Sequence, residues 1–351
     1  MASIFDIDPN FRINTKLGRD DVKFYDVREA PFSLHGVFYE ECRFTRMPDA
    51  VAKNVSEGVC YLNSNTAGGR VRFRTDSPFV AIHAKMFNLD KMSHFTVCGS
   101  AGFDLYVNED GEEKYAATFQ PPFNMTEGYE SLATLNGSKM RDITINFPLY
   151  SGVESLYVGV SETATVCEAM PYEIDCPIVF YGSSITQGGC ASRPGNSYQG
   201  FLSRRFNADY INLGFSGSAK GEDAITEYIS GLDMSVFVYD YDHNAPTTDH
   251  LEKTHEKMFK RIRETHPDVP VIMMSRPVYC LSEDEEIRRS IVEKTYRNAL
   301  ESGDRNVYFI DGRTLMALAG NEGTVDGCHP NDLGFASMAK AVGDVLEKIL
   351  G

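Results

Sequence analysis

The chain has 351 residues, of which 42% are hydrophobic, and a formal net charge of −16. At about 150 residues per domain, this length predicts two globular domains. No apolar run approaches the about 18–20 residues that a membrane span needs, so we expect no membrane partner. Nucleic acid is also an unsuitable partner, because phosphate binding needs clustered basic side chains and acidic residues outnumber basic ones by 50 to 34. A neutral substrate suits this charge best.

The N-terminal segment has no basic region followed by an apolar stretch and a cleavage site, so we expect a cytoplasmic protein. The cysteines form no C-x-x-C pair and no zinc-like spacing, which indicates reduced thiols rather than a metal site or a disulfide framework. They lie at Cys42, Cys60, Cys98, Cys167, Cys176, Cys190, Cys280 and Cys328. His250 and His255 are not at the four-residue spacing of a zinc pair, and we expect them on a solvated helix face.

The first half of the chain, residues 1–165, has the pattern of an antiparallel β-sandwich. Short runs of β-branched and aromatic residues alternate with Gly, Asn, Asp and Pro, at 71–86, 94–112 and 141–160. Residues 108–111, with the sequence Asn-Glu-Asp-Gly, predict a hairpin loop within this half.

A linker over 166–176 and a second domain over 177–351 follow. In that second domain, apolar strands alternate with amphipathic helices, which predicts a parallel five-stranded sheet covered by helices on both faces. The predicted strands are 177–182, 210–215, 236–241, 269–275 and 307–312, and the predicted helices are 197–206, 222–229, 248–264, 283–300 and 332–350. Ligands of such sheets lie beyond the carboxyl ends of the strands.

Three strand ends carry residues with catalytic potential. Ser184 follows the first strand in a glycine-rich turn, where its hydroxyl can be exposed beside backbone N–H groups, although such a serine is often only a helix cap. Gly217, after the second strand, and Asn244, after the third, could each donate a hydrogen bond to an oxyanion. A turn glycine and a turn or capping asparagine are the alternatives.

A histidine near the C-terminus completes the set. His329 lies directly before the last predicted helix and could accept a proton from a serine, with Asp326 three residues upstream to orient its ring. The alternative is an exposed loop histidine, with Asn331 or Asp332 serving as the helix cap.

In order, these segments resemble the four sequence blocks of the SGNH/GDSL hydrolase superfamily: G-[DS]-S-I-T-x-G, N-x-G-x-S-G, an Asn block and D-G-x-H-P. The resemblance implies a flavodoxin-like domain in which Ser184 is the nucleophile, His329 the general base and Asp326 its orienting acid. It also implies an oxyanion hole formed by the N–H groups of Ser184 and Gly217 and the amide of Asn244. The sequence leaves open whether Asp326 completes a triad or a dyad with a backbone carbonyl suffices.

Two positions depart from the common pattern of this superfamily. Ser183 stands where many relatives have Asp, and the third block reads Asp242-x-Asn244-Ala245 rather than G-x-N-D. Asn244 is therefore the assignment for which the motif gives the weakest support.

Residues 102–106, Gly-Phe-Asp-Leu-Tyr, resemble the G-x-D-L-Y signature of a jelly-roll-like sandwich that precedes certain SGNH hydrolases. One interpretation is structural, with Leu105 and Tyr106 in the core and Asp104 capping a turn. The other is that the sandwich forms one wall of the cleft and helps to bind substrate.

This two-domain arrangement is similar to that of carbohydrate acetylesterases. It implies a serine esterase that removes O-acetyl groups from plant-derived oligosaccharides, such as fragments of acetylated mannan or xylan, without a cofactor or metal. A lipase or thioesterase acting on acyl chains and a non-catalytic carbohydrate-binding protein are the alternatives. The sugar, the acetylated position and the oligomeric state stay open.

Overall fold

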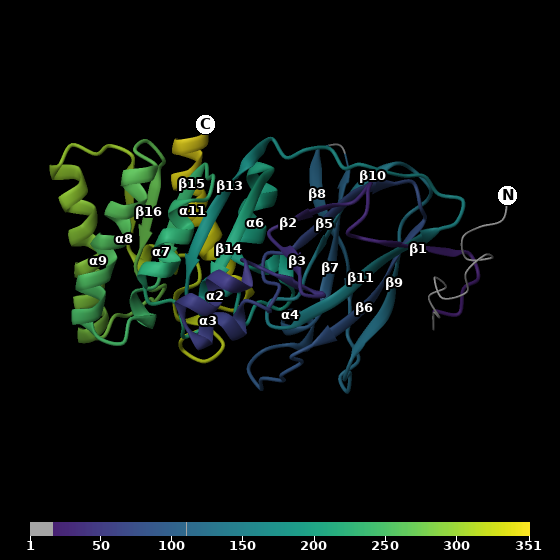
Figure 1. Cartoon of the computed structure of the whole chain (residues 1–351), viewed down its shortest axis with the longest axis horizontal. Coiled ribbons are helices and arrows are strands. Elements are labelled where there is room, and N and C mark those ends of the chain that lie inside the picture. Colours follow the sequence, from purple (N-terminus) through teal and green to yellow (C-terminus); the bar gives the residue numbers. More distant parts are fainter. Residues whose placement is uncertain (1–16, 110) are drawn as a thin grey trace.

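The computed structural model describes residues 17–109 and 111–351. An antiparallel β-sandwich and an α/β domain lie side by side along the longest axis of the molecule (Figure 1). The N-terminal segment used to predict localisation, and Asp110 of the predicted hairpin loop, lie outside the described residues. No helix within the described ranges is both long and apolar enough to cross a membrane.

The sandwich consists of two antiparallel sheets. The smaller has the strand order β1-β11-β6-β9, and the larger has the order β12-β5-β10-β7-β8 with β2 also paired to β5. The strands of the smaller sheet are β1 (Val22–Asp26), β6 (Phe79–Phe87), β9 (Gly128–Thr134) and β11 (Gly152–Ser161). Those of the larger are β2 (Ser33–His35), β5 (Arg70–Thr75), β7 (Phe103–Glu109), β8 (Glu112–Phe119), β10 (Arg141–Asn146) and β12 (Val166–Cys167).

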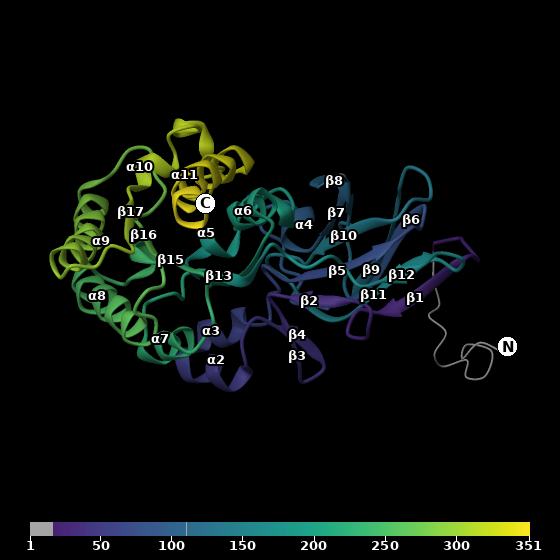
Figure 2. The same ribbon diagram turned by 90° about the horizontal axis from the view of Figure 1, so that it is seen from above.

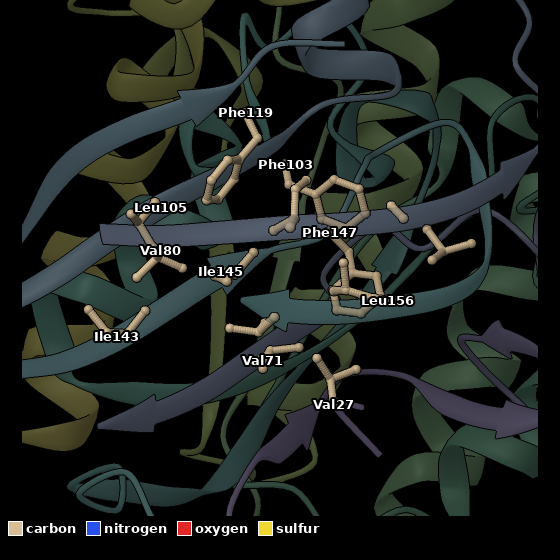
Figure 3. Packing of buried hydrophobic residues seen from close by; sticks show 14 of the residues in the cluster. Val27, Val71, Val80, Phe103, Leu105, Phe119, Ile143, Ile145, Phe147 and Leu156 are labelled. Atoms are coloured by element: carbon tan, nitrogen blue, oxygen red, sulfur yellow. The ribbon is translucent and has the colours of Figure 1, made fainter. Parts of the chain in front are cut away.

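Alternate residues of these strands form the sandwich core, because successive side chains of a strand point to opposite faces. Phe103 and Leu105 of β7 and Ile143 and Ile145 of β10 are fully buried, and Figure 3 shows them packed together with Val80 of the smaller sheet. The apolar residues of the alternating sequence pattern therefore form the core between the two sheets.

One predicted strand was wrong in part. Within 94–112, Val97–Ser100 forms the short helix α4, and Thr96 caps it by accepting a hydrogen bond from Gly99 N at 3.1 Å. The strand β7 begins only at Phe103 and pairs with β8 as the predicted hairpin. The segment was predicted as a strand because it is rich in apolar residues. A helix of four residues is too short to show a helical period in the sequence.

Two further helices, α2 (Asp49–Val55) and α3 (Glu57–Leu62), were not predicted. They belong to the N-terminal half of the sequence, after the small hairpin of β3 (Phe38–Glu40) and β4 (Arg43–Thr45). Their apolar side chains Ala52, Val59 and Leu62 join the core of the α/β domain rather than that of the sandwich. The first half of the chain thus supplies part of the second domain.

The α/β domain is built on a parallel sheet with the strand order β14-β13-β15-β16-β17. Numbered within the domain, this is the order 2-1-3-4-5 of flavodoxin-like folds, as the resemblance implied. Its strands are β13 (Ile174–Gly182), β14 (Ala208–Gly214), β15 (Val236–Asp240), β16 (Val271–Met274) and β17 (Val307–Ile310).

Helices cover both faces of this sheet. Figure 2 shows α7, α8 and α9 on one face, together with α2 and α3, and α6 and α11 on the other. The long helices are α6 (Tyr198–Phe206), α7 (Asp223–Ser230), α8 (Thr248–Thr265), α9 (Glu283–Glu301) and α11 (Asp332–Leu350), and the short ones are α5 (Ser184–Gln187) and α10 (Gly312–Leu315). The predicted helices agree with the five long ones to within one residue at each end.

The expectation for His255 was wrong. Its side chain is only 1% exposed, stacks against Tyr239 and places Nδ1 2.9 Å from Thr295 Oγ1. Burial lowers the pKa of this imidazole to about 4, so the ring is neutral at physiological pH. His255 is a core residue of α8, on the face packed against β15 and α9.

Candidate active site

Ser184 is the first residue of α5, immediately after the turn that ends the strand β13. The capping function belongs to its neighbour Ser183, whose hydroxyl accepts a hydrogen bond from Ile185 N at 3.1 Å. Ser184 Oγ is therefore free for another partner, and the Ser184 N–H has no acceptor inside the helix because it lies in the first turn. The side chain is 7% exposed, so a reagent reaching it enters a confined site.

The hydroxyl of Ser184 meets the imidazole of His329. Ser184 Oγ lies 3.0 Å from His329 Nε2, and the other ring nitrogen, Nδ1, lies 2.8 Å from Asp326 Oδ2. The structure thus brings together, within hydrogen-bond distance, three residues that the motifs had singled out from sequence positions up to 145 residues apart. This is the arrangement of nucleophile, base and orienting acid used by serine hydrolases.

Asp326 orients the histidine loop as well as its ring. Asp326 Oδ1 accepts hydrogen bonds from the backbone N–H groups of Cys328 at 2.9 Å and His329 at 2.7 Å. Partial burial opposes ionisation of this carboxyl group, but the hydrogen bonds from the ring and backbone of His329 outweigh it and lower its pKa to about 2. Asp326 is therefore a carboxylate, and His329 Nδ1 carries the proton directed at it, which leaves Nε2 as the acceptor for the serine.

The two other predicted oxyanion donors follow the strands on either side of β13. Gly217 comes after β14 and has a φ of +64°, a conformation that favours glycine. No described residue accepts a hydrogen bond from its N–H, and a side chain added there would meet no atom within 4 Å. The N–H group of Gly217 is thus left without an acceptor among the described residues, at a position with room for a ligand.

Asn244 ends the short 3-10 turn η3 (Asp242–Asn244) that follows β15. Its Oδ1 atom is buried without a partner among the described residues. Arg288 stabilises this turn, because its Nη1 donates hydrogen bonds to Asp242 O at 2.6 Å and Ala245 O at 2.9 Å. Because β14, β13 and β15 are neighbours, Gly217, Ser184 and Asn244 follow adjacent carboxyl ends of one sheet. No hydrogen bond between these three appears in the described part of the chain.

A buried acid under the nucleophile turn was missed by the sequence analysis. Asp240, the last residue of β15, is 1% exposed and accepts a hydrogen bond from Thr186 Oγ1 of α5. Burial raises the pKa of this carboxyl group well above its usual range, and the hydrogen bond from Thr186 opposes that shift. A Cβ on Gly182 would lie 1.7 Å from Asp240 Oδ1, which explains the glycine that ends β13.

Residues of the sandwich domain reach the same turn. Tyr150 donates its hydroxyl hydrogen to Ser184 O at 3.2 Å, and the ring of Phe95 packs edge-on against Tyr150. Thr96 Oγ1 donates to Ser192 O at 2.8 Å, and the ring centroid of His94 is 5.5 Å from that of His329. The site is therefore enclosed by both domains.

The G-x-D-L-Y segment contributes to this contact through Asp104, which does not cap a turn. Its carboxylate is fully buried and accepts hydrogen bonds from Asn146 Nδ2 at 2.7 Å, Gly195 N at 2.8 Å and Arg193 Nη1 at 2.9 Å. Leu105 and Tyr106 are both buried, as the structural interpretation predicts, and the hydroxyl of Tyr106 also receives a hydrogen bond from Arg193. Asp104 fixes the loop that joins α5 to α6.

None of these sandwich contributions has a local signal in the sequence. His94 and Tyr150 lie in irregular segments, and their partners at the site are 235 and 34 residues away. Asp104 was singled out only as part of the G-x-D-L-Y signature, and its predicted role as a turn cap was wrong.

A parallel sheet of flavodoxin-like order with a Ser–His–Asp arrangement at its carboxyl edge defines a serine hydrolase of the SGNH type. Sequence comparison agrees with this class: residues 175–347 match the GDSL-like lipase/acylhydrolase family, and residues 22–166 match the N-terminal domain of SGNH-hydrolase-type esterases, the GxDLY domain. The chain belongs to the two-domain SGNH/GDSL hydrolases with an N-terminal GxDLY domain. No curated protein matches it in sequence.

Solved structures of similar architecture include a GDSL-like protein from Bacteroides ovatus, with 28% identity, a TM-score of 0.83 and coverage of 94% of this chain and 98% of that one. The salicylyl-acyltransferase SsfX3 of a tetracycline biosynthetic pathway has 18% identity, a TM-score of 0.75 and coverage of 95% and 99%. A family two carbohydrate esterase from Clostridium thermocellum, in complex with cellohexaose, has 17% identity, a TM-score of 0.58 and coverage of 81% and 93%. The last two likenesses concern the fold alone.

Proposed function

We propose that this protein is a carbohydrate O-acetylesterase that hydrolyses acetyl esters of neutral oligosaccharides through an acyl-enzyme intermediate. The observation that carries the proposal is the 3.0 Å contact of Ser184 Oγ with His329 Nε2, backed by the 2.8 Å contact of His329 Nδ1 with Asp326. Geometry of this kind is what nucleophilic catalysis by a serine requires.

In the first half of the reaction, Ser184 Oγ attacks the carbonyl carbon of the acetyl ester while His329 Nε2 takes its proton. The tetrahedral oxyanion receives hydrogen bonds from the N–H groups of Ser184 and Gly217 and from the amide of Asn244. Each such donor contributes about 10²–10³-fold to turnover in serine hydrolases. The intermediate collapses when His329 returns the proton to the sugar oxygen, which leaves as an alcohol.

In the second half, a water molecule takes the place of the sugar and loses a proton to His329 Nε2 as it attacks the acetyl-serine carbonyl. Acetic acid leaves and ionises in solution, and the proton held by His329 returns to Ser184 Oγ. The Asp326 carboxylate, with its pKa lowered to about 2, faces the imidazolium that forms in both halves and stabilises its charge.

Two features support a neutral carbohydrate as the substrate. The net charge of −16 disfavours strongly anionic substrates. The sandwich domain also reaches the site: exposed His94 lies beside His329, where it could contact a substrate larger than a simple acetyl ester. Structural relatives of the same two-domain architecture include carbohydrate esterases.

The test is mass spectrometry of acetylated manno- and xylo-oligosaccharides incubated with the wild type and with Ser184→Ala. We expect stepwise loss of acetyl groups with the wild type, and a rate reduced by about 10⁶-fold in the variant. Equal deacetylation by both proteins would remove Ser184 as the nucleophile.

A series of model esters from acetyl to octanoyl separates this proposal from a lipase or thioesterase. Activity that falls with acyl length agrees with an acetylesterase, whereas activity that rises with it contradicts the proposed substrate class. A serine-reactive phosphonate that fails to label Ser184 would instead point to a non-catalytic carbohydrate-binding protein.

A further inference from the structure

A second histidine and a cysteine lie beside the catalytic histidine. One nitrogen of His94, one nitrogen of His329 and Cys190 Sγ all lie within 4.8 Å of one another. They come from three separate segments: the loop before α4, the turn after α5 and the loop before α11. The sequence spacing gave no hint of this group, because it forms only when the two domains meet.

Of the two ring nitrogens of His329, Nε2 is the one that Asp326 leaves available as a metal ligand. Its Nδ1 is occupied by Asp326, and the ring carbon bonded to Nε2, Cδ2, lies 3.4 Å from where a Cβ on Gly189 would stand. The ring thus packs against the turn that carries Cys190, and its Nε2 atom lies 3.0 Å from Ser184 Oγ.

We propose that His94, Cys190 and His329 bind a thiophilic divalent cation such as Zn²⁺, and that the bound ion inhibits the enzyme. Two imidazoles and one thiolate form a donor set suited to Zn²⁺, whereas Mg²⁺ and Ca²⁺ prefer oxygen ligands. Binding releases the thiol proton of Cys190 to solvent, since the thiolate is the ligand.

The geometry needs only a small adjustment. In a tetrahedral site with Zn–N distances of about 2.0 Å and a Zn–S distance of about 2.3 Å, the ligand atoms are about 3.3–3.6 Å apart. The present separations of at most 4.8 Å thus close by about 1 Å. His94 is exposed and can make that movement, while Cys190, buried in the turn, and His329, held by Asp326, stay in place.

Inhibition follows because the ion binds to the nitrogen of His329 that catalysis uses. With its lone pair on the cation, His329 Nε2 cannot accept the proton of Ser184. The inhibition rests on the proposed function, whereas the binding of the ion does not, so the two are measured separately.

Binding is measured on the full-length protein with Cd²⁺, through the ultraviolet charge-transfer band of a cadmium thiolate, and with Zn²⁺ by titration calorimetry. We expect one ion per chain, and affinity at least about tenfold lower in His94→Ala and in Cys190→Ser. The control variants Cys176→Ser, at the opposite end of β13, and Cys328→Ser, beside His329 but outside the donor set, should keep the band. An unchanged band in Cys190→Ser, or its loss in Cys328→Ser, would overturn the proposal.

Inhibition is measured with an acetyl ester at increasing Zn²⁺, each variant relative to its own rate without metal. The concentration for half-inhibition should rise at least about tenfold in His94→Ala, an exposed position whose substitution leaves the core intact. Ser184→Ala should bind the ion although it is inactive, which separates failure of the metal site from failure of the proposed function. Binding without inhibition of an active wild type would show that His329 is not a ligand.

Discussion

Substituting Asp326 with either Asn or Ala tests how the acid acts on the histidine. Asp326 Oδ1 holds the backbone N–H groups of Cys328 and His329, and Oδ2 accepts the proton on His329 Nδ1. In Asp326→Asn the amide oxygen must stay with the two backbone donors, so that the NH₂ group faces Nδ1. That nitrogen then becomes an acceptor, the proton moves to Nε2, and His329 can no longer take a proton from Ser184.

In Asp326→Ala the loop loses two hydrogen bonds, but water can accept the Nδ1 proton and the productive tautomer survives. We therefore expect Asp326→Asn to be the more stable of the two variants and Asp326→Ala to be the more active. Loss of the carboxylate from a fully buried triad costs about 10⁴-fold in turnover. The side chain of Asp326 is 32% exposed, so we expect about 10³-fold for Asn and about 10²-fold for Ala.

The assay is kcat/KM on an aryl acetate, with thermal unfolding measured on the same samples. Glu322→Gln, an exposed acidic residue of the same loop region, is the matched control and should retain wild-type activity. Asn at position 326 more active than Ala would refute the tautomer argument. A loss below tenfold in both variants would mean that a dyad operates without the acid.

Three other predictions concern stability. Asp104→Asn leaves Arg193 without its buried carboxylate and should cost about 3–5 kcal/mol of unfolding free energy in denaturant titrations; a loss below about 1 kcal/mol would contradict the importance of this contact. Gly182→Ala places a Cβ 1.7 Å from Asp240 Oδ1 and should cost about 1–3 kcal/mol, with a melting temperature equal to the wild type as the contrary result. Because the pKa of Asp326 is lowered to about 2, its contribution to stability is complete above about pH 5 and is lost as the pH falls towards 2; acid titrations of Asp326→Asn should show a smaller loss over that range, and an identical loss would oppose the assignment.

Glu112→Gln is the matched control for the Asp104 substitution. Glu112 also pairs with a basic residue, Lys114 at 2.8 Å, but both side chains are largely exposed. An exposed pair of this kind contributes about 0–1 kcal/mol. The difference between the two variants in unfolding free energy therefore reports the effect of burying the carboxylate, since both variants lose one negative charge.

The α/β half could be predicted closely because its helices carry both a period and a start signal. The helix α9 begins with a capping box of Ser282 and Glu285, and α11 is capped by Asn331, whose side chain accepts a hydrogen bond from Gly334 N at 3.1 Å. In contrast, α2 and α3 are seven and six residues long, and the surface they cover belongs to the other domain. Helices that depend on distant packing leave little trace in a local pattern.

Some residues of the candidate site could likewise be predicted from the sequence, and others could not. Ser184, Asp326 and His329 were found because they lie in short sequence blocks that resemble those of the SGNH/GDSL superfamily, in the same order along the chain. His94 and Tyr150 were not found, because what gives them a role is contact across the domain boundary. A single sequence can reveal the chemistry at a strand end, but not the segment that folds over it.

The contacts between the domains also decide how the role of the sandwich can be tested. Arg46, buried and lying in the N-terminal half, donates to Gly214 O at the end of β14, and Arg70 pairs with Asp209 at the start of the same strand. Deleting residues 1–165 would remove these partners, together with α2 and α3 from the core of the α/β domain, and would leave Asp209 unpaired. Inactivity of such a fragment would report damage to the sheet rather than loss of a substrate-binding wall. Single substitutions at exposed positions such as His94 are the cleaner test, because they alter the wall and leave the contacts that hold the two domains together.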